Sequence, residues 1–199
     1  MIEEAVKIEK KPSKSKTKLK VALVELLSQK KLEDITIIEL TNHAQINRKT
    51  FYLHYKSINS VLKDIENNLI DKLNNALKEF NLSSNTFHDF IYISLTTIIE
   101  DELALQIFLN TSSSKNIIKI IDKICTEYMY AVLRKKYPLA NKEMIAYVVE
   151  YHVYGSMRIF YNWLKEKEST MDLKAFSVFL ATIINDGIDK VTENAICND

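Results

Sequence analysis

The stretch that decides the fold is residues 36–56, TIIELTNHAQINRKTFYLHYK. Its spacing of apolar and polar residues predicts two short helices joined by a tight turn. Thr36 and Glu39 form a possible capping box at the start of the first helix, and Asn47 is a favourable N-cap for the second. A short, rigid helix with basic and hydroxyl side chains at its exposed N-terminal end fits the major groove of DNA.

The second helix begins with the three side chains best suited to reach base edges, Arg48, Lys49 and Thr50. An Arg or Lys paired with guanine typically gives about 1–3 kcal/mol of discrimination between bases. Phe51 and Tyr55, four residues apart, are expected to point into the core, whereas the polar side chains near them are expected to hold phosphates. The alternative for the two basic residues, taken alone, is an ordinary solvated helix start. The candidate DNA-contacting set is Thr36, Asn47, Arg48, Lys49, Thr50, Tyr52, His54 and Lys56.

Turn-forming residues are scarce in this chain of 199 residues, which has two glycines, Gly155 and Gly187, and two prolines. Average usage is about 7% Gly and 5% Pro, so the composition favours long helices over sandwiches and barrels. Because no glycine precedes Gly155, neither common Gly-rich phosphate loop is present. We therefore expect an all-α fold of about nine helices, in which a three-helix helix-turn-helix head precedes a larger helical body.

Charge is distributed unevenly between the two ends of the chain. Residues 1–56 hold twelve Lys/Arg and seven Asp/Glu, a balance of +5, whereas residues 57–199 hold fifteen and nineteen, a balance of −4. A basic head on an acidic body fits a polyanion as the partner of the head. A solvated, disordered Lys-rich tail explains the same asymmetry equally well, so charge leaves both interpretations open.

Helical periodicity divides the chain into a flexible basic arm at 1–13, a helix-turn-helix head at 14–56 and a larger helical body at 57–199. The first helix is expected to follow Ser13 or Ser15, and a long helix is expected from Ser57 to about residue 80. The remaining helical patterns are separated by polar breaks. They run over residues 86–102, 103–110, 116–136, 141–166 and 172–193.

The last two helical patterns, 141–166 and 172–193, are apolar nearly all round, and such helices must be covered on two sides. The rest of the body covers one side, and a second copy of the chain would cover the other in a four-helix interface. The alternative is that both helices fill a larger monomer core. The expected interface residues are His152, Gly155, Ile159, Trp163, Leu180, Ile183, Ile184 and Gly187.

Enzyme chemistry is not indicated. The four histidines are dispersed, and the one His–carboxylate neighbour pair, His88-Asp89, points in two directions on a helix. No two histidines stand four apart with a glutamate between them.

Cys125 and Cys197 lack metal-site spacing and suggest a reducing compartment. Without a signal peptide or an apolar run of about 18 residues, the chain is expected to be cytoplasmic, with no membrane association, metal or cofactor.

Residues 15–62 resemble the DNA-binding head of TetR-type (TetR/AcrR) bacterial transcriptional regulators. Residues 36–40 look like the capped second helix of that family. Residues 47–55 look like its recognition helix, with the typical aromatic residue at Tyr52 and a His–aromatic pair at positions 54 and 55. Residues 48–56 are similar to a subgroup common in low-GC Gram-positive bacteria. In the body, the resemblance extends to the helix plan, a glycine at position 155 and a tryptophan eight residues later.

The resemblance implies a dimeric regulator, expected to be a repressor, that binds a double-stranded DNA operator. A small-molecule effector, whose identity is unknown, would bind between the helices of the body and shift operator affinity. Side chains that would suit an apolar cavity are Tyr92, Tyr128, Met129, Tyr151, Tyr154 and Met157, although each also suits an ordinary core. The alternative is a co-regulator of the same fold that acts mainly through a protein or metabolic partner.

Two positions depart from the family pattern. The turn between the two helices usually carries a glycine with left-handed backbone, and here it carries Gln45, at a cost of roughly 1–2 kcal/mol. The start of the linking helix usually carries a lysine that meets a phosphate, and here it carries Ile58. Lys56 and the basic arm could substitute for that lysine.

Overall fold

The computed structural model describes residues 13–78, 87–110, 115–166 and 170–196, with side chains described as far as Gly187. The described contacts form two compact units, residues 1–64 and residues 65–199, which we call the head and the body and describe separately. The division falls inside a long helix, α4 (Ile58–Lys78), eight residues beyond the boundary suggested by periodicity. Of the expected basic arm, only Ser13 lies within the described residues.

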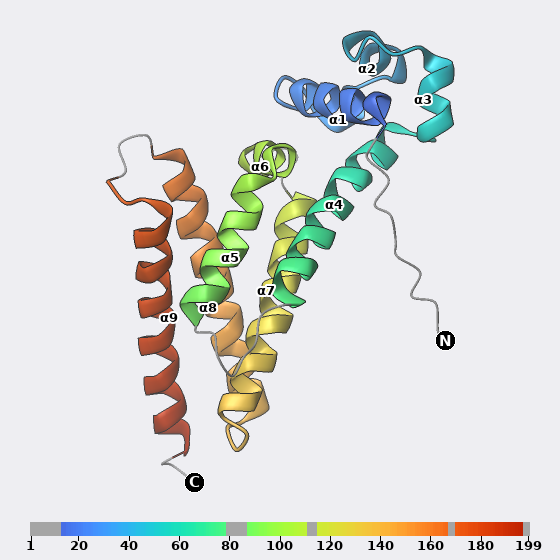
Figure 1. The fold of residues 1–199 in the computed structure, drawn as a ribbon. Helices are drawn as coiled ribbons and strands as arrows, with labels where there is room; N and C mark the ends of the chain where they lie inside the picture. The colour runs from blue at the N-terminus through green and yellow to red at the C-terminus, as the bar shows by residue number, and fades with distance from the viewer. Residues whose placement is uncertain (1–12, 79–86, 111–114, 167–169, 197–199) are drawn as a thin grey trace, which may run out of the picture. The chain divides into compact units, whose positions relative to one another are not determined.

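The head consists of short helices whose starts carry the polar caps expected from the sequence (Figure 1). Ser13 caps the first helix, since its Oγ accepts a hydrogen bond from the Lys16 N–H at 3.3 Å. Thr36 Oγ1 accepts from the Glu39 N–H at 3.2 Å, and Asn47 Oδ1 accepts from the Lys49 N–H at 2.8 Å. The elements are α1 Lys14–Leu27, a short 3-10 helix at Leu32–Asp34, α2 Ile37–His43 and α3 Arg48–His54.

The head has its own apolar core, formed where α1 packs on α2 and α3. Phe51 of α3 is completely buried, and Tyr55, one turn later, is buried with it, as the spacing of four predicted. The other fully buried side chains of this core are Leu19, Leu23, Leu40 and Val61.

The turn between α2 and α3 is closed by backbone hydrogen bonds around a left-handed residue. Gln45 has φ of 54°, the one positive φ of a non-glycine residue among the residues described. The Gln45 N–H donates to the Asn42 carbonyl at 3.1 Å, and the Ile46 N–H donates to the Thr41 carbonyl at 2.9 Å, which is the Schellman pattern. The predicted left-handed conformation at Gln45 is therefore confirmed.

The end of α3 and the start of α4 are joined within the head by a partly buried polar cluster. The Tyr55 hydroxyl donates to Asp64 Oδ2 at 2.6 Å, and Lys20 Nζ lies 3.1 Å from the same oxygen. Burial alone would raise the pKa of Asp64, but the hydrogen bonds from Tyr55 and Lys20 and the charges of Lys20 and Lys16 together hold it below its ordinary value. The carboxylate therefore stays charged and ties α1, the end of α3 and the first turns of α4 together.

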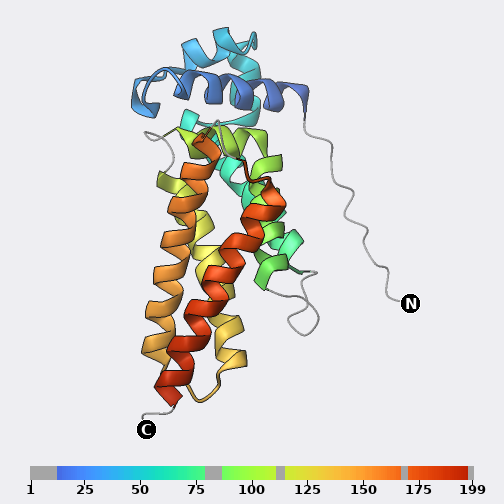
Figure 2. The same ribbon diagram turned by 90° about the vertical axis from the view of Figure 1, so that its left-hand side faces the viewer.

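The body is built from long helices that pack in pairs. In both views α5 lies beside α9 and α7 lies beside α8 (Figures 1 and 2), while the short helix α6 contacts α5 and α7. These helices agree with the predicted ranges to within about three residues; the predicted breaks at 81–85, 111–114 and 168–169 lie outside the described residues. The elements are α5 Phe87–Glu100, α6 Glu102–Leu109, α7 Lys115–Lys136, α8 Lys142–Lys165 and α9 Leu173–Ile196.

An aromatic cluster and an ion pair fix the body helices to one another. The rings of Phe108, Phe160 and Phe176 are buried, with the centroid of Phe160 at 5.7 Å from Phe108 and 6.3 Å from Phe176. Asp101 caps α6, since its Oδ1 accepts from the Ala104 N–H at 3.1 Å, and its Oδ2 lies 2.8 Å from Lys72 Nζ. These contacts connect α6 to the later part of α4 and to the helices around the core.

Candidate functional site

The exposed surface of α3 collects most of the side chains that the sequence suggested for DNA contact. Asn47, Arg48, Lys49 and Lys56 are exposed, Tyr52 keeps 53% of its surface exposed, and Thr50 and His54 are half-buried. The first turn of α3 contains no acidic residue. Positive side chains therefore stand at the end of the helix where the peptide dipoles also favour an anion.

Local contacts of these side chains determine which of their rings are held in place and which hydrogen-bonding groups remain for a ligand. The edge of the Tyr52 ring packs on buried Phe51, with centroids 5.4 Å apart, so its aromatic body is anchored while the residue stays half exposed. Thr36 uses an oxygen lone pair to cap α2, which leaves its O–H as a donor. His54 Nε2 lies 3.4 Å from Ser13 Oγ, so the start of α1 steadies the end of α3.

Leu53 is the residue on this surface that sequence reasoning missed. It is 81% exposed, which is unusual for leucine, and it follows Lys49 by four residues and Thr50 by three. Those spacings place the three side chains on neighbouring positions of one helical face. An apolar side chain here suits the methyl group of thymine in the major groove. The sequence could have revealed this exposure, because position 53 lies on the helix face opposite Phe51 and Tyr55.

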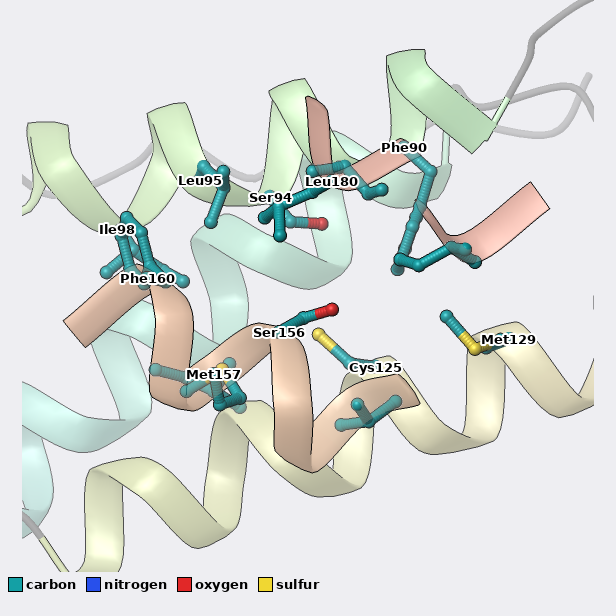
Figure 3. Close-up of a pocket in the computed structure, with 14 residues that line it drawn as sticks. Phe90, Ser94, Leu95, Ile98, Cys125, Met129, Ser156, Met157, Phe160 and Leu180 are labelled. Atoms are coloured by element: carbon teal, nitrogen blue, oxygen red, sulfur yellow. The ribbon is translucent and has the colours of Figure 1, made fainter. Parts of the chain in front are cut away.

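The body contains a partly open cavity of about 50 Å³ between α5, α7, α8 and α9 (Figure 3). Its wall is almost entirely apolar, with Ser94, Cys125 and Ser156 as the polar side chains on it. Burial, and then the charge of Asp122, raises the pKa of the Cys125 thiol to about 12. The thiol is therefore neutral at physiological pH, and the cavity contains no charge of its own.

The structure brings two of the six predicted ligand-binding residues, Met129 and Met157, to this wall. The four predicted tyrosines do not lie on this wall. Tyr151 and Tyr154 are 77% and 56% exposed on the outside of α8. Tyr92 is exposed and stacks on His88 at 6.1 Å, and Tyr128 stacks on Phe90 at 4.2 Å without lining the cavity. The exposed positions of Tyr151 and Tyr154 keep their hydroxyls near water, which the polar end of a tyrosine favours.

Five of the eight predicted interface residues make contacts within the body, and the interface itself stays a prediction. Leu180 and Ile184 are buried and line the cavity, and the Trp163 ring stacks on Phe176 at 4.5 Å. His152 and Gly187 pack against each other, because a Cβ on Gly187 would lie 2.9 Å from His152 Cε1. His152, Leu180 and Ile184 are buried inside the chain, whereas Trp163 and Gly187 keep part of their surface exposed.

The other three predicted interface residues, Gly155, Ile159 and Ile183, face outward. A Cβ at Gly155 would meet nothing within 4 Å, so the glycine leaves a shallow spot on the surface of α8. Around these residues lies an exposed apolar stripe that spans α8 and α9. We define the outer stripe as Tyr147, Tyr151, Tyr154, Ile159, Val178, Phe179 and Ile183, each of which keeps at least 37% of its surface exposed.

His152 makes the stability of the body depend on pH. Burial lowers the pKa of its imidazole below the ordinary value of 6.5, so the unfolded chain binds a proton at pH values where the folded chain does not. The free energy of unfolding should therefore fall as pH drops below about 6.5, and should be insensitive to this group above that value. Urea unfolding of the wild type and of His152→Gln at pH 5, 6, 7 and 8 measures the difference. Parallel pH profiles in the two proteins would contradict the assignment.

Solved structures identify the fold, although no protein-family model and no curated protein matches the sequence. A TetR transcriptional regulator from Streptococcus agalactiae 2603V has 19% identity, covers 86% of this chain and 93% of its own, and superposes with a TM-score of 0.63. NalD, the secondary repressor of the MexAB-OprM multidrug efflux pump in Pseudomonas aeruginosa, has 14% identity, coverage of 87% and 95%, and a TM-score of 0.62.

A third match is the fatty acid degradation regulator FadR from Bacillus halodurans, with 14% identity, coverage of 88% and 96%, and a TM-score of 0.61. The chain therefore has the all-helical fold of TetR-family transcriptional regulators, with the helix-turn-helix region at its N-terminus. Within the described ranges, no helix has the length and apolarity needed to cross a membrane, and no group of three potential metal ligands is found there.

Proposed function

We propose that this protein is a sequence-specific, DNA-binding transcriptional regulator that acts as a homodimeric repressor in the cytoplasm and responds to a small molecule bound in the body. The observation that carries the proposal is the exposed basic and hydroxyl surface of α3, held on a buried Phe51 anchor in the fold of TetR-type regulators. NalD, which shares this fold, is named as a repressor, and that supports repression here.

In this proposal α3 enters the major groove with Arg48, Lys49 and Thr50 toward base edges. The side chains flanking them hold phosphates, which sets the register. Thr36 supplies a hydroxyl, Lys56 supplies a charge, and Tyr52 supplies a phenol on an anchored ring. Since the linking helix begins with Ile58 rather than a lysine, Lys56 is the nearest cation able to neutralise a phosphate at that end.

The outer stripe supports the homodimer. Tyr147, Tyr151 and Tyr154 follow one another on α8 at spacings of four and three, and Phe179 and Ile183 stand four apart on α9, so each of these two sets lies on one side of its helix. Large exposed apolar patches on proteins mark interaction sites. A twofold axis would place α8 and α9 of each protomer in a four-helix interface, and the dimer would carry two α3 helices for the two half-sites of an operator.

The cavity supports the regulatory part of the proposal. A ligand shifts operator affinity only by the difference in its affinity for the DNA-binding and the non-binding forms. A pocket bounded by four body helices is a suitable place for such a difference, because filling it changes how those helices pack. We propose that Met129 and Met157, whose unbranched side chains adapt easily, move to admit the effector.

An operator titration tests the proposal. Wild type, Arg48→Ala and Lys49→Ala are titrated against the DNA flanking the protein's own gene at two salt concentrations. Each variant should lose about 5- to 150-fold in operator affinity, corresponding to about 1–3 kcal/mol per base contact, and wild-type affinity should fall steeply with salt because phosphate neutralisation releases counterions. Lys123→Ala, which removes an exposed body lysine, is the control and should bind like wild type.

A salt-insensitive, weak interaction that neither head variant changes would contradict DNA reading. It would favour the co-regulator alternative, for which the absence of a lysine at Ile58 is the supporting observation. A pull-down with the wild-type chain would then be the appropriate experiment.

A further inference from the structure

The chemistry of the body cavity restricts the class of molecule that can occupy it. None of the fourteen side chains on its wall carries a charge at neutral pH, and the wall therefore offers no counter-ion to a carboxylate, a phosphate or an ammonium group. Moving an unpaired charge into an apolar interior is strongly unfavourable. The occupant must therefore be uncharged and mainly apolar.

Ser94 is the polar side chain of the wall whose hydroxyl group is unsatisfied. It is 4% exposed, and its Oγ has no hydrogen-bond partner among the described residues. A serine or threonine inside a helix usually satisfies its hydroxyl on a carbonyl one turn earlier, as Thr97 does on Ile93 of the same helix at 2.8 Å. Ser94 does not, and Figure 3 shows its oxygen directed into the space between α5 and the opposite wall. A buried hydroxyl left unpaired is costly, and an acceptor oxygen on a ligand would relieve that cost.

The size of the cavity limits the ligand further. Its volume of about 50 Å³ is roughly a third of the ~150 Å³ of an apolar cavity known to admit benzene. The space accepts a few aliphatic carbons as it stands. Longer molecules require the flexible side chains of Met129 and Met157, on opposite helices, to move aside.

We propose that the body cavity is a binding site for uncharged aliphatic molecules that carry one hydroxyl or carbonyl oxygen, with the Ser94 hydroxyl donating a hydrogen bond to that oxygen. This inference defines the class of effector and rests on the proposed function for its link to DNA. The binding itself is a property of the body and is measured without DNA.

The experiment titrates the full-length protein by calorimetry with three probes of one chain length at pH 7: 1-hexanol, hexanoate and hexylammonium. We expect saturable binding of 1-hexanol and at least tenfold weaker binding of the two ions. Equal affinity for 1-hexanol and either ion, or no saturable binding of 1-hexanol, would overturn the proposal.

Two buried serines make a matched pair for the role of Ser94. Ser94→Ala should weaken 1-hexanol binding by about 2- to 12-fold, the range expected from the net strength of one hydrogen bond, while leaving the unliganded protein as stable or more stable. Ser177 is equally buried but lies off the wall, and its hydroxyl is already bonded to the Lys174 carbonyl at 2.8 Å. Ser177→Ala should therefore destabilise the protein and leave 1-hexanol affinity unchanged. Unchanged affinity in Ser94→Ala would overturn its role as the donor.

The two proposals fail in different ways. Operator binding that responds to Lys49→Ala, in a protein that shows no 1-hexanol isotherm, rejects the ligand class and keeps the regulator. A saturable 1-hexanol isotherm in a protein that binds no operator supports the site and rejects the regulator. A saturable isotherm that leaves operator affinity unchanged supports the site and rejects its role as the effector site.

Discussion

Phe51→Ala is expected to unfold the head and, through that loss of fold, to abolish operator binding. The Phe51 side chain is completely buried where α1 meets α3, and replacing a buried phenylalanine by alanine costs about 3–5 kcal/mol. Whole domains are stable by only about 5–15 kcal/mol, and a small three-helix unit lies toward the lower end. Thermal and urea unfolding followed by circular dichroism, together with the operator titration, measures both consequences.

The adjacent residue gives the control for this experiment. Tyr52 is 53% exposed, so Tyr52→Ala should leave the unfolding midpoint of the head nearly unchanged and reduce operator affinity on its own. Comparison of Phe51→Ala with Tyr52→Ala distinguishes DNA binding lost because the head unfolds from DNA binding lost because one contact is missing. A folded Phe51→Ala head with normal operator affinity would show that α3 is not anchored as described, and normal affinity in Tyr52→Ala would remove that residue from the contact set.

Phe179→Asp is expected to convert the protein from a dimer to a folded monomer. Phe179 lies on the outer stripe with 42% of its surface exposed, so an aspartate there is solvated in the isolated protomer. In the proposed four-helix interface the same carboxylate would be buried against apolar side chains without a partner. A penalty on the order of 3 kcal/mol or more raises the dimer Kd by at least about 100-fold, which sedimentation velocity at micromolar concentration would detect.

Leu139→Asp is the matched control, because it places the same charge at a leucine that is 87% exposed in the turn before α8, outside the outer stripe. This variant should remain dimeric. A Phe179→Asp protein that sediments like wild type would rule out the outer stripe as the interface. A wild type that is monomeric at these concentrations would rule out the homodimer.

The head could be predicted from the sequence nearly residue by residue, because its features are local. Ser13, Thr36 and Asn47 are caps that act on backbone N–H groups two or three residues away, and such bonds do not depend on distant neighbours. The burial of Phe51 and the exposure of Tyr52 follow from the 100° step between consecutive residues of a helix. The left-handed conformation at Gln45 was implied by the resemblance, because TetR-type sequences usually carry a glycine at this turn.

The sequence predicted the helices of the body, but it did not predict which side of each helix is buried. Residues 141–166 are apolar on most sides, so the pattern alone does not say which side meets the other helices of the chain. Tertiary packing of α8 against α7 and α9 turned His152 inward and Tyr151 outward, although the two are neighbours in sequence. The sequence pointed to four tyrosines and two methionines for the cavity, and the structure places the two methionines on its wall together with other apolar side chains and Ser94.

What the sequence determined by itself was the all-helical fold, the caps, the turn and the exposed side of α3, because each depends on contacts within about one helical turn. What only the tertiary structure decided was which apolar faces are covered within the chain, where a cavity remains between four helices, and which stripe is left for a partner. Those outcomes depend on the volumes and orientations of side chains brought together from residues far apart in the chain, and close packing in the interior makes every such choice conditional on the others.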